Sequence, residues 1–374
     1  MNSDYVTDLI NCIDNFVVMY ANVDSLPNKL EEVKNRIKSL NNKPDVIALT
    51  EVKHKNKWNM EVQELQIDGY QLYSNNLNGN SRGIIIYVNI DIYSKQIVTD
   101  DCSECLLLEL NTHNNSKLLI CTIYRSPNSS LDNDHKIFKF IDYTCSNYMG
   151  NKLFLGDFNW PHINWDKWCT SNSIESKFLD ILRKIFLDQH VSKPTRARGT
   201  DTPHLLDLVI SDGSFIENID YDAPFGKSDH CVLHIECNFN LHKKRGVDRF
   251  AFSKGDYDRL RNSLHLNWKE ILDPYVSDVD KLWTTLKREL DNKINAHIPK
   301  IRSFNSWKKE SWTQPLDPCL RKIIARKKRL WTRYIETRDA YIHKKYKAVR
   351  NKVNREIKKI NRAEHRATTC CRCM

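Results

Sequence analysis

The chain has 374 residues, of which 40% are hydrophobic and 10% aromatic, so it carries enough apolar surface to build a folded core. It contains no apolar run of 18 residues, which argues against a membrane span, and its acidic N-terminus lacks the composition of a signal peptide. The net charge of +11 is uneven: residues 241–374 carry 35 Lys and Arg against 15 Asp and Glu, whereas residues 1–240 carry 23 against 32. A basic second part favours a polyanionic partner.

Short apolar runs between residues 15 and 240 predict buried strands. These runs are residues 16–20, 46–49, 83–88, 118–124, 153–155, 206–210 and 231–235. Helical periodicity over residues 26–40 and 174–187 predicts two helices, and Pro27 just inside the first is compatible with a helix start. Because strands outnumber helices, we expect a layered α/β domain rather than a helical bundle.

The composition changes near residue 240. Residues 242–246 suggest a linker, and from Ser253 onward the pattern is helical and rich in Trp, Lys and Arg. Residues 316–366 predict one or two long basic helices. We therefore expect an N-terminal tail (1–14), an α/β domain (15–240) and a basic helical extension (241–374).

Twelve cysteines are scattered along the chain, several of them inside apolar runs. Disulfide scaffolds are small, secreted and regularly spaced, so we expect buried thiols in a reducing, intracellular compartment. Cys370, Cys371 and Cys373, with His365 nearby, raise the alternative of a zinc site. A tetrahedral site needs two spaced ligand pairs, so an arbitrary end of a broken reading frame is the preferred interpretation of this cluster.

Polar residues follow several predicted strands, at the position where α/β folds build active sites. Asn22 follows the first strand, Glu51 ends the second, and Tyr124-Arg125 ends the run 118–124. A single strand-end carboxylate is more often merely solvated, and a tyrosine there is usually a core residue. Arg125 suits a phosphate oxygen, because guanidinium matches the geometry of that group.

The segment Gly156-Asp157-Phe158-Asn159 follows the apolar run 153–155 and is the most specific single motif. Glycine permits a sharp turn, and Asp157 and Asn159, two residues apart, then face the same side. An acceptor beside an amide is suited to orienting a water nucleophile. The same spacing also occurs in ordinary Asx-turns, which is the alternative for this segment.

Asp207 lies inside an apolar strand, where a carboxylate is costly to bury unless it is paired. Asp229 and His230 directly precede the last predicted strand. We predict that Asp207 hydrogen-bonds His230, holds it in one tautomer and forms an acid–base dyad with it. In the alternative, Asp207 caps a turn and His230 is an ordinary surface histidine.

The ordered series of these motifs over residues 15–236 resembles the endonuclease/exonuclease/phosphatase superfamily. Within it, the block 156–165, the segment 124–127 and Pro194-Thr195-Arg196 resemble the DNA-nicking endonuclease of LINE-type (non-LTR, jockey-like) retrotransposons. The resemblance implies a four-layer sandwich of two mixed β-sheets flanked by helices, with a basic helical extension towards a reverse transcriptase. His204 departs from the Ser or Asn usual there, and the lack of polymerase motifs before Met374 suggests a truncated copy or partial gene model.

The resemblance implies a phosphodiesterase that depends on Mg²⁺, with Mn²⁺ as a substitute. It makes Glu51 the principal metal ligand, with Asn22 and Asp229 close to it. Asp157 orients or deprotonates the attacking water, and Asn159 holds that water or a phosphate oxygen.

The remaining implied roles concern the phosphate. His230, oriented by Asp207, contacts the scissile phosphate, and Tyr124 donates to a phosphate oxygen or to the leaving oxygen. The expected nucleic-acid-binding residues are Arg125, Thr195 and Arg196.

The function expected from the resemblance is nicking of double-stranded DNA in the nucleus for target-primed retrotransposition, with element RNA as a second ligand of the basic extension. Three alternatives remain: an abasic-site repair nuclease, a phosphatase of lipids or inositol phosphates, and a non-catalytic nucleic-acid-binding remnant. The block 160–165 and the basic extension disfavour the repair nuclease. The extension also suits a long polyanion better than a small phosphate ester, and the complete motif series speaks against a decayed site.

Overall fold

The computed structural model describes residues 16–54, 61–75, 77, 81–98, 102–112, 117–199, 201–239, 247–276, 278–303 and 317–371. The expected N-terminal tail (1–14) and the linker at 242–246 lie outside these ranges. The side chains of the terminal cysteine cluster lie outside the described part as well. The possibility of zinc there stays untested.

Two compact units make up the chain: Met1–Lys243 together with Thr313–Met374, and Lys244–Trp312. The first boundary lies close to the expected end of the α/β domain at residue 240. The basic extension, expected as one region, is divided, because its last part packs with the α/β domain.

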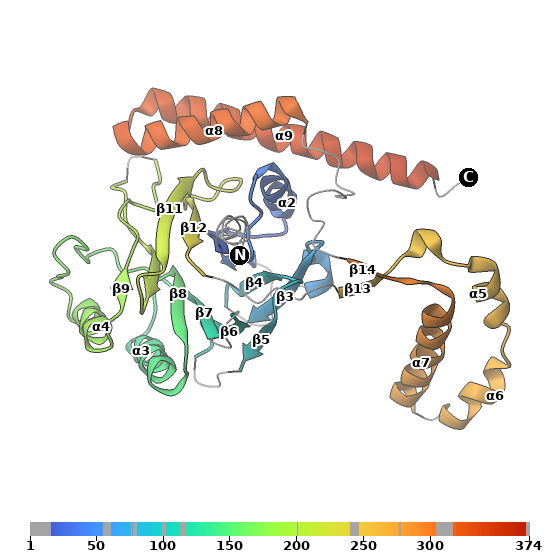
Figure 1. The fold of residues 1–374 in the computed structure, drawn as a ribbon. Coiled ribbons are helices and arrows are strands. Elements are labelled where there is room, and N and C mark those ends of the chain that lie inside the picture. The colour runs from blue at the N-terminus through green and yellow to red at the C-terminus, as the bar shows by residue number, and fades with distance from the viewer. Residues whose placement is uncertain are drawn as a thin grey trace, which may run out of the picture. The chain divides into compact units, whose positions relative to one another are not determined.

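Two six-stranded mixed sheets form the centre of the first unit (Figure 1). The first sheet has the order β11 (Ile216–Asp222), β12 (Val232–Cys237), β1 (Phe16–Asn22), β2 (Val46–Thr50), β4 (Ile84–Asn89), β3 (Tyr70–Asn75). The second has the order β5 (Ser94–Ile97), β6 (Cys105–Asn111), β7 (Lys117–Tyr124), β8 (Asn151–Asp157), β10 (Asp207–Ser211), β9 (Asp188–Gln189). Each sheet has one parallel pair, β1–β2 or β7–β8, flanked by antiparallel pairs.

The layers follow from the alternation of side chains along each strand. Phe16, Val18 and Tyr20 of β1 join the core between the two sheets, whereas Met19 and Ala21 pack on the outer face with α2 (Leu30–Ser39). The outer face of the second sheet is covered by α3 (Leu131–Asn147) and α4 (Ser173–Lys184). The four-layer α/β sandwich is therefore confirmed.

Each of the seven predicted strands is present, with bounds shifted by at most a few residues. The helix expected from residue 26 begins only at Leu30, because its N-cap residue Lys29 has a φ of −128°, outside the helical region. A short 3₁₀ helix, η1 (Val62–Leu65), precedes β3. Cys102 and Cys105 form a disulfide, so the expectation of free thiols is wrong at this pair, whereas Cys121, Cys231 and Cys237 are buried thiols.

Two long helices, α8 (Pro318–Thr337) and α9 (Ala340–Cys371), confirm the basic helical C-terminal region and run side by side (Figure 1). Their apolar side chains, including Trp331, Tyr334 and Tyr346, belong to the same cluster as the core between the sheets. The hairpin is thus a packed part of the first unit. In the described part of the chain, no helix has the length and apolar character needed to cross a membrane.

The second unit is small. Its strands β13 (Val247–Phe250) and β14 (Lys300–Ser303) pair antiparallel. Its helices are α5 (Tyr257–Ser263), α6 (Trp268–Leu272) and α7 (Val279–His297), with short 3₁₀ turns η2 (Phe252–Lys254) and η3 (Asp273–Tyr275).

Candidate active site

The parallel strand pairs bring most of the predicted site residues to one edge of the sandwich. Asn22 ends β1 and lies opposite Thr50, so Glu51 follows immediately beside it. In the second sheet Tyr124 and Asp157 end β7 and β8 and lie opposite one another. Asp207 begins β10 and lies opposite Asp157.

Asn22 links two carboxylates of this edge. Its side-chain amide donates to Glu51 Oε1 at 3.0 Å and to Asp157 Oδ2 at 2.8 Å. Asn22 and Asp157 are each 1% exposed, and Glu51 keeps 15% of its side chain exposed. The first and second sheets therefore meet through the Asn22 amide, with the partly exposed Glu51 carboxylate at its outer side.

His230 is paired with Asp207 as predicted. His230 Nδ1 lies 2.8 Å from Asp207 Oδ2, and His230 Nε2 lies 3.8 Å from Asp157 Oδ2. Asp207 is fully buried and His230 is 6% exposed, so the alternative of a surface histidine is wrong. The other nitrogen of the ring faces the carboxylate that the sequence assigned to the water nucleophile.

Tyr20, which had no predicted role, and Thr195 hold Asp207 in place. Tyr20 donates its hydroxyl to Asp207 Oδ1 at 2.9 Å. Thr195 Oγ1 accepts the backbone N–H groups of Leu206 and Asp207, at 3.2 and 3.0 Å. Thr195 is buried and bonded to this strand, so it positions Asp207 instead of binding nucleic acid as expected. Period-two alternation along β1, which puts Tyr20 and Asn22 on one face, was the available signal for Tyr20.

The pKa values of His230, Asp157 and Tyr124 indicate which of these groups carry a proton at neutral pH. Burial opposes protonation of His230, but the carboxylates of Asp207 and Asp157 outweigh it and raise the pKa of His230 to about 10. Burial also raises the pKa of Asp157 to about 7, against the lowering effect of His230. Burial, helped by Glu51 and Asp157, raises the pKa of Tyr124 well above its ordinary value. Tyr124 and His230 thus carry protons at neutral pH, and Asp157 is poised to exchange one.

Arg125 and Asn159 hold the loop after β8. Asn159 Nδ2 donates to the Arg125 carbonyl at 2.7 Å, and Arg125 Nη1 donates to the Asn159 carbonyl at 3.1 Å. The Arg125 guanidinium also pairs with both oxygens of Asp134, at 2.6 and 3.0 Å, and stacks 3.7 Å from the Trp160 ring centre. Because Arg125 is buried and engaged on these partners, it positions the loop and does not present itself to phosphate as expected.

The backbone of this edge is unusual at two predicted positions. Glu51 and Asn159 have φ of 51° and 50°, in the left-handed region. Such conformations cost free energy in non-glycine residues and concentrate at functional sites. The Asn159 N–H also bonds Asp157 Oδ1 at 3.2 Å, so the Asx-turn exists alongside the contact of Asp157 with Asn22.

Arginines flank the cluster on both sides. Arg82, which sequence analysis missed, pairs with Glu51 Oε2 at 2.6 Å and with Asp24 Oδ1 at 2.7 Å. Arg196 pairs with Asp229 Oδ2 at 3.0 Å. The contacts described for Asp229 are with Arg196 and His230, which places it at the His230 side of the edge. Nothing in the sequence around Arg82 marked it, because its relevance comes from the pairing of β2 with β4.

Position 204, where the sequence departs from the family pattern, is held mainly through its backbone. The His204 carbonyl accepts the N–H groups of Thr195 and Arg196, at 2.9 and 3.0 Å. This strand-like bridge ties the residue three positions before Asp207 to the segment that carries Arg196.

The oxygen donors of this edge fit a hard divalent cation, which prefers carboxylate and amide oxygens and retains several waters. Asp157, Asp207 and His230 place ligand atoms within 4.8 Å of one another. Asp207, however, is fully buried, and its two oxygens are already engaged by Tyr20 and His230. Glu51, which keeps 15% of its side chain exposed beside Asn22, is the better ligand.

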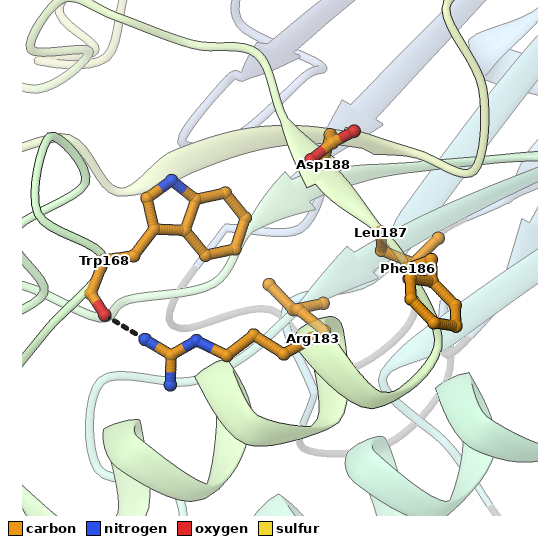
Figure 2. A pocket seen from close by; sticks show the side chains of 6 residues that line it. Trp168, Arg183, Phe186, Leu187 and Asp188 are labelled. Atoms are coloured by element: carbon orange, nitrogen blue, oxygen red, sulfur yellow. Dashed lines mark hydrogen bonds between the residues drawn. The ribbon is translucent and has the colours of Figure 1, made fainter.

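A pocket of about 320 Å³ lies elsewhere in the same domain (Figure 2). It is lined by Trp168, Leu182, Arg183, Phe186, Leu187 and Asp188. Asp188 pairs with Ser211 at the far end of β10, the strand whose first residue is Asp207. The pocket contains none of the predicted site residues, and the chemistry of this domain lies at the other end of the strands.

Comparisons with known proteins agree with the geometry. Residues 19–168 match a family model described as endonuclease/exonuclease/phosphatase family, and residues 118–234 match one described as endonuclease-reverse transcriptase. A comparison with curated protein sequences gave no match.

Three solved structures are among those found in a comparison of structures. The endonuclease domain of TRAS1, a telomere-specific non-LTR retrotransposon, is 15% identical with a TM-score of 0.47, covering 61% of this chain and 100% of that one. The AP endonuclease LMAP from Leishmania major is 14% identical with a TM-score of 0.48, covering 63% and 90%. An AP endonuclease from Archaeoglobus fulgidus is 14% identical with a TM-score of 0.42, covering 59% and 98%. The two family models overlap and together span the strands that carry the site, so residues 19–234 of this chain are similar to the endonuclease/exonuclease/phosphatase family.

Proposed function

We propose that this chain is a Mg²⁺-dependent endonuclease that nicks one strand of duplex DNA and derives from a non-LTR retroelement. The observation that carries the proposal is the arrangement at the sheet edge: the His230–Asp207 pair faces Asp157, which shares the Asn22 amide with Glu51. The retroelement origin is supported by the match of residues 118–234 to an endonuclease-reverse transcriptase model.

Hydrolysis of a phosphodiester needs an activated water, stabilisation of charge on the phosphoryl oxygens and support for the leaving oxygen. Asp157, with a pKa raised to about 7 by burial, accepts a proton from the attacking water. His230, protonated at neutral pH, donates through Nε2 to a phosphoryl oxygen, while Nδ1 stays bonded to Asp207. Tyr124 keeps its proton and donates to a phosphoryl oxygen or the leaving oxygen.

Glu51 would hold the cation, with the Asn22 amide beside it. When bound there, Mg²⁺ or Mn²⁺ would supply neutralisation of the charge that builds up on the phosphate. Arg82 holds the Glu51 carboxylate at the outer side of the edge. Asn159, fixed through Arg125, orders the loop that presents Asp157.

The experiment is a plasmid assay with the full chain. Supercoiled plasmid should convert to the open circular form with Mg²⁺ and remain supercoiled with EDTA. The nicks should be extended directly by a DNA polymerase, because target-primed synthesis requires a free 3′-hydroxyl. The His230→Ala protein, purified by the same procedure, is the control for a contaminating nuclease. Nicking that persists in EDTA or in the His230→Ala protein contradicts the proposal.

A further inference from the structure

Helix α8 is bonded to two loops of the catalytic edge. Lys327, fully buried, donates to Glu32 Oε1 at 2.5 Å and to the Pro224 carbonyl at 2.6 Å. Pro224 belongs to the connection between β11 and β12, which also carries Asp229 and His230. Further along the helix, α8 contacts the second loop, which contains Gly199 and Asp201.

Tyr334 and Arg338 hold that second loop. Tyr334 donates its hydroxyl to the Gly199 carbonyl at 2.5 Å, and Arg338 donates to the carbonyls of Gly199 and Asp201 at 3.1 and 2.5 Å. Arg196, three residues earlier in this loop, pairs with Asp229. Helix α8 therefore borders the loops on both sides of Asp229, and a polymer that enters the catalytic edge comes close to it.

The outward face of α8 is a line of cations. The buried positions of the helix recur every three or four residues: Leu320, Ile324, Lys327, Trp331 and Tyr334. The opposite face presents an exposed series at the same spacing, here named the basic stripe: Lys322, Arg326, Arg329 and Arg333. Exposed residues on the matching face of α9 continue it: Lys344, Arg355, Lys358 and Arg362.

Acidic side chains do not offset this charge. Between residues 318 and 337 the sequence has one acidic residue, Glu336, and between 340 and 362 it has one, Glu356. Glu356 is paired with Lys359. A solvated helix face usually mixes both signs, so an excess of this size favours a polyanion.

We propose that the basic stripe binds the phosphate backbone of duplex DNA beside the cleavage point. The identity of the polymer rests on the proposed function, which brings a duplex to the neighbouring catalytic edge. A straight helix presents its charges in a fixed line, about 16 Å long from the first to the last stripe residue. That line matches a stiff duplex, which carries one charge per roughly 1.7 Å of its axis.

The test measures binding separately from cleavage. The full chain, in EDTA, is titrated into a fluorescein-labelled duplex of about 30 base pairs, and anisotropy gives the affinity from about 50 to 200 mM KCl. One variant replaces the basic stripe with glutamine (Lys322→Gln, Arg326→Gln, Arg329→Gln, Arg333→Gln). A matched control removes four exposed charges from the second unit (Lys254→Gln, Lys269→Gln, Lys287→Gln, Arg288→Gln).

Each phosphate contact contributes a slope of about −0.9 in log K against log salt, so removing four such contacts should reduce the slope of the stripe variant by roughly 3.6. The control should keep the wild-type slope. With Mg²⁺, the stripe variant should nick plasmid with a raised KM and an unchanged kcat. An equal loss in both variants, an unchanged slope in the stripe variant, or a loss confined to single-stranded RNA overturns the inference. Because the anisotropy readout needs no cleavage, a chain that binds through the stripe but fails to nick contradicts only the proposed function.

Discussion

The hydroxyl of Tyr20 bonds one oxygen of Asp207 at 2.9 Å, and the second oxygen of the same carboxylate lies 2.8 Å from Nδ1 of His230. The carboxylate is therefore fixed from two sides before it orients the imidazole. Both Asp207 and His230 are buried, so neither contact competes with bulk water.

Asp207→Asn should lower the nicking rate strongly while the protein stays folded. An amide in this position favours the wrong imidazole tautomer, and the corresponding change in a serine protease triad lowers kcat by about 10⁴-fold, which sets the expected scale of the loss. Tyr20→Phe, which removes one hydrogen bond and keeps the ring, is the matched control and should cost far less. The measurement is the initial rate of plasmid nicking at saturating Mg²⁺. Equal rates for Asp207→Asn and wild type would show that the pair is merely structural.

His230 and His234 should titrate in opposite directions. The pKa of His230 is raised to about 10 by its carboxylate neighbours in spite of burial, whereas burial lowers the pKa of His234 to about 4. NMR of the imidazole resonances in EDTA should show His230 protonated and His234 neutral at pH 7. Since the folded pKa of His230 lies above the unfolded value of about 6.5, its stabilising effect is complete below pH 6.5 and is lost as the pH rises through about 10. A His230 midpoint at or below about 6.5 would contradict this electrostatic account.

Gly156→Ala should destabilise the domain severely. A Cβ at Gly156 would lie 1.8 Å from the Ile123 carbonyl oxygen, so β7 and β8 could not keep their close approach. Overpacking of this kind typically costs about 1–3 kcal/mol and sometimes more, and backbone atoms cannot yield as a side chain does. At Gly213 the nearest atom to an added Cβ is a side-chain carbon at 3.3 Å, so Gly213→Ala serves as the control. Equal urea midpoints for the two variants would refute the expected crowding.

Lys327→Met should loosen the C-terminal hairpin from the nuclease domain. The change leaves Glu32 buried without its ammonium partner, and breaking a buried pair in this way costs about 3–5 kcal/mol. The double variant Lys327→Met/Glu32→Gln should recover part of that loss, and Lys328→Met, one residue further on the exposed face, should have little effect. Thermal unfolding and protection of α8 amides from hydrogen exchange measure the result. Unchanged protection in Lys327→Met would mean that this contact does not hold the helix.

The strands and site motifs that the sequence revealed share one property, which is continuous burial. The strands β1, β2, β7, β8 and β10 are buried along most of their length, and apolar runs identify such strands. The edge strands β3, β5 and β11 are partly exposed and polar, so they carry no such run. Helix α3 was missed as well, although its Ser130 N-cap bonds the Asn133 N–H and was a usable signal.

Site residues that directly follow predicted strands could be identified from the sequence. Residues whose partner depends on how distant segments pack together could not. Asp207 and His230 could be paired because a buried carboxylate demands a donor. The partners of Arg125 could not be anticipated, because Asp134 lies on the unpredicted helix α3. Arg82 reaches Glu51 only through the register of β2 with β4, which local sequence does not specify.

The pairing of β1 with β12 joins Phe16 to Cys237 and Ala21 to Val232. During synthesis on the ribosome, β1 therefore cannot pair with β12 until more than 200 further residues have been made. Contacts between residues this far apart in sequence form slowly. Until then the strand end that carries Asn22 has no His230 beside it. Asn22, Glu51 and Asp157 are therefore synthesised well before Asp207 and His230, and the site cannot form until all five are present. The candidate active site is complete only when the last strand of the sandwich has emerged, and α8, which contacts the loops around the site, is made later still.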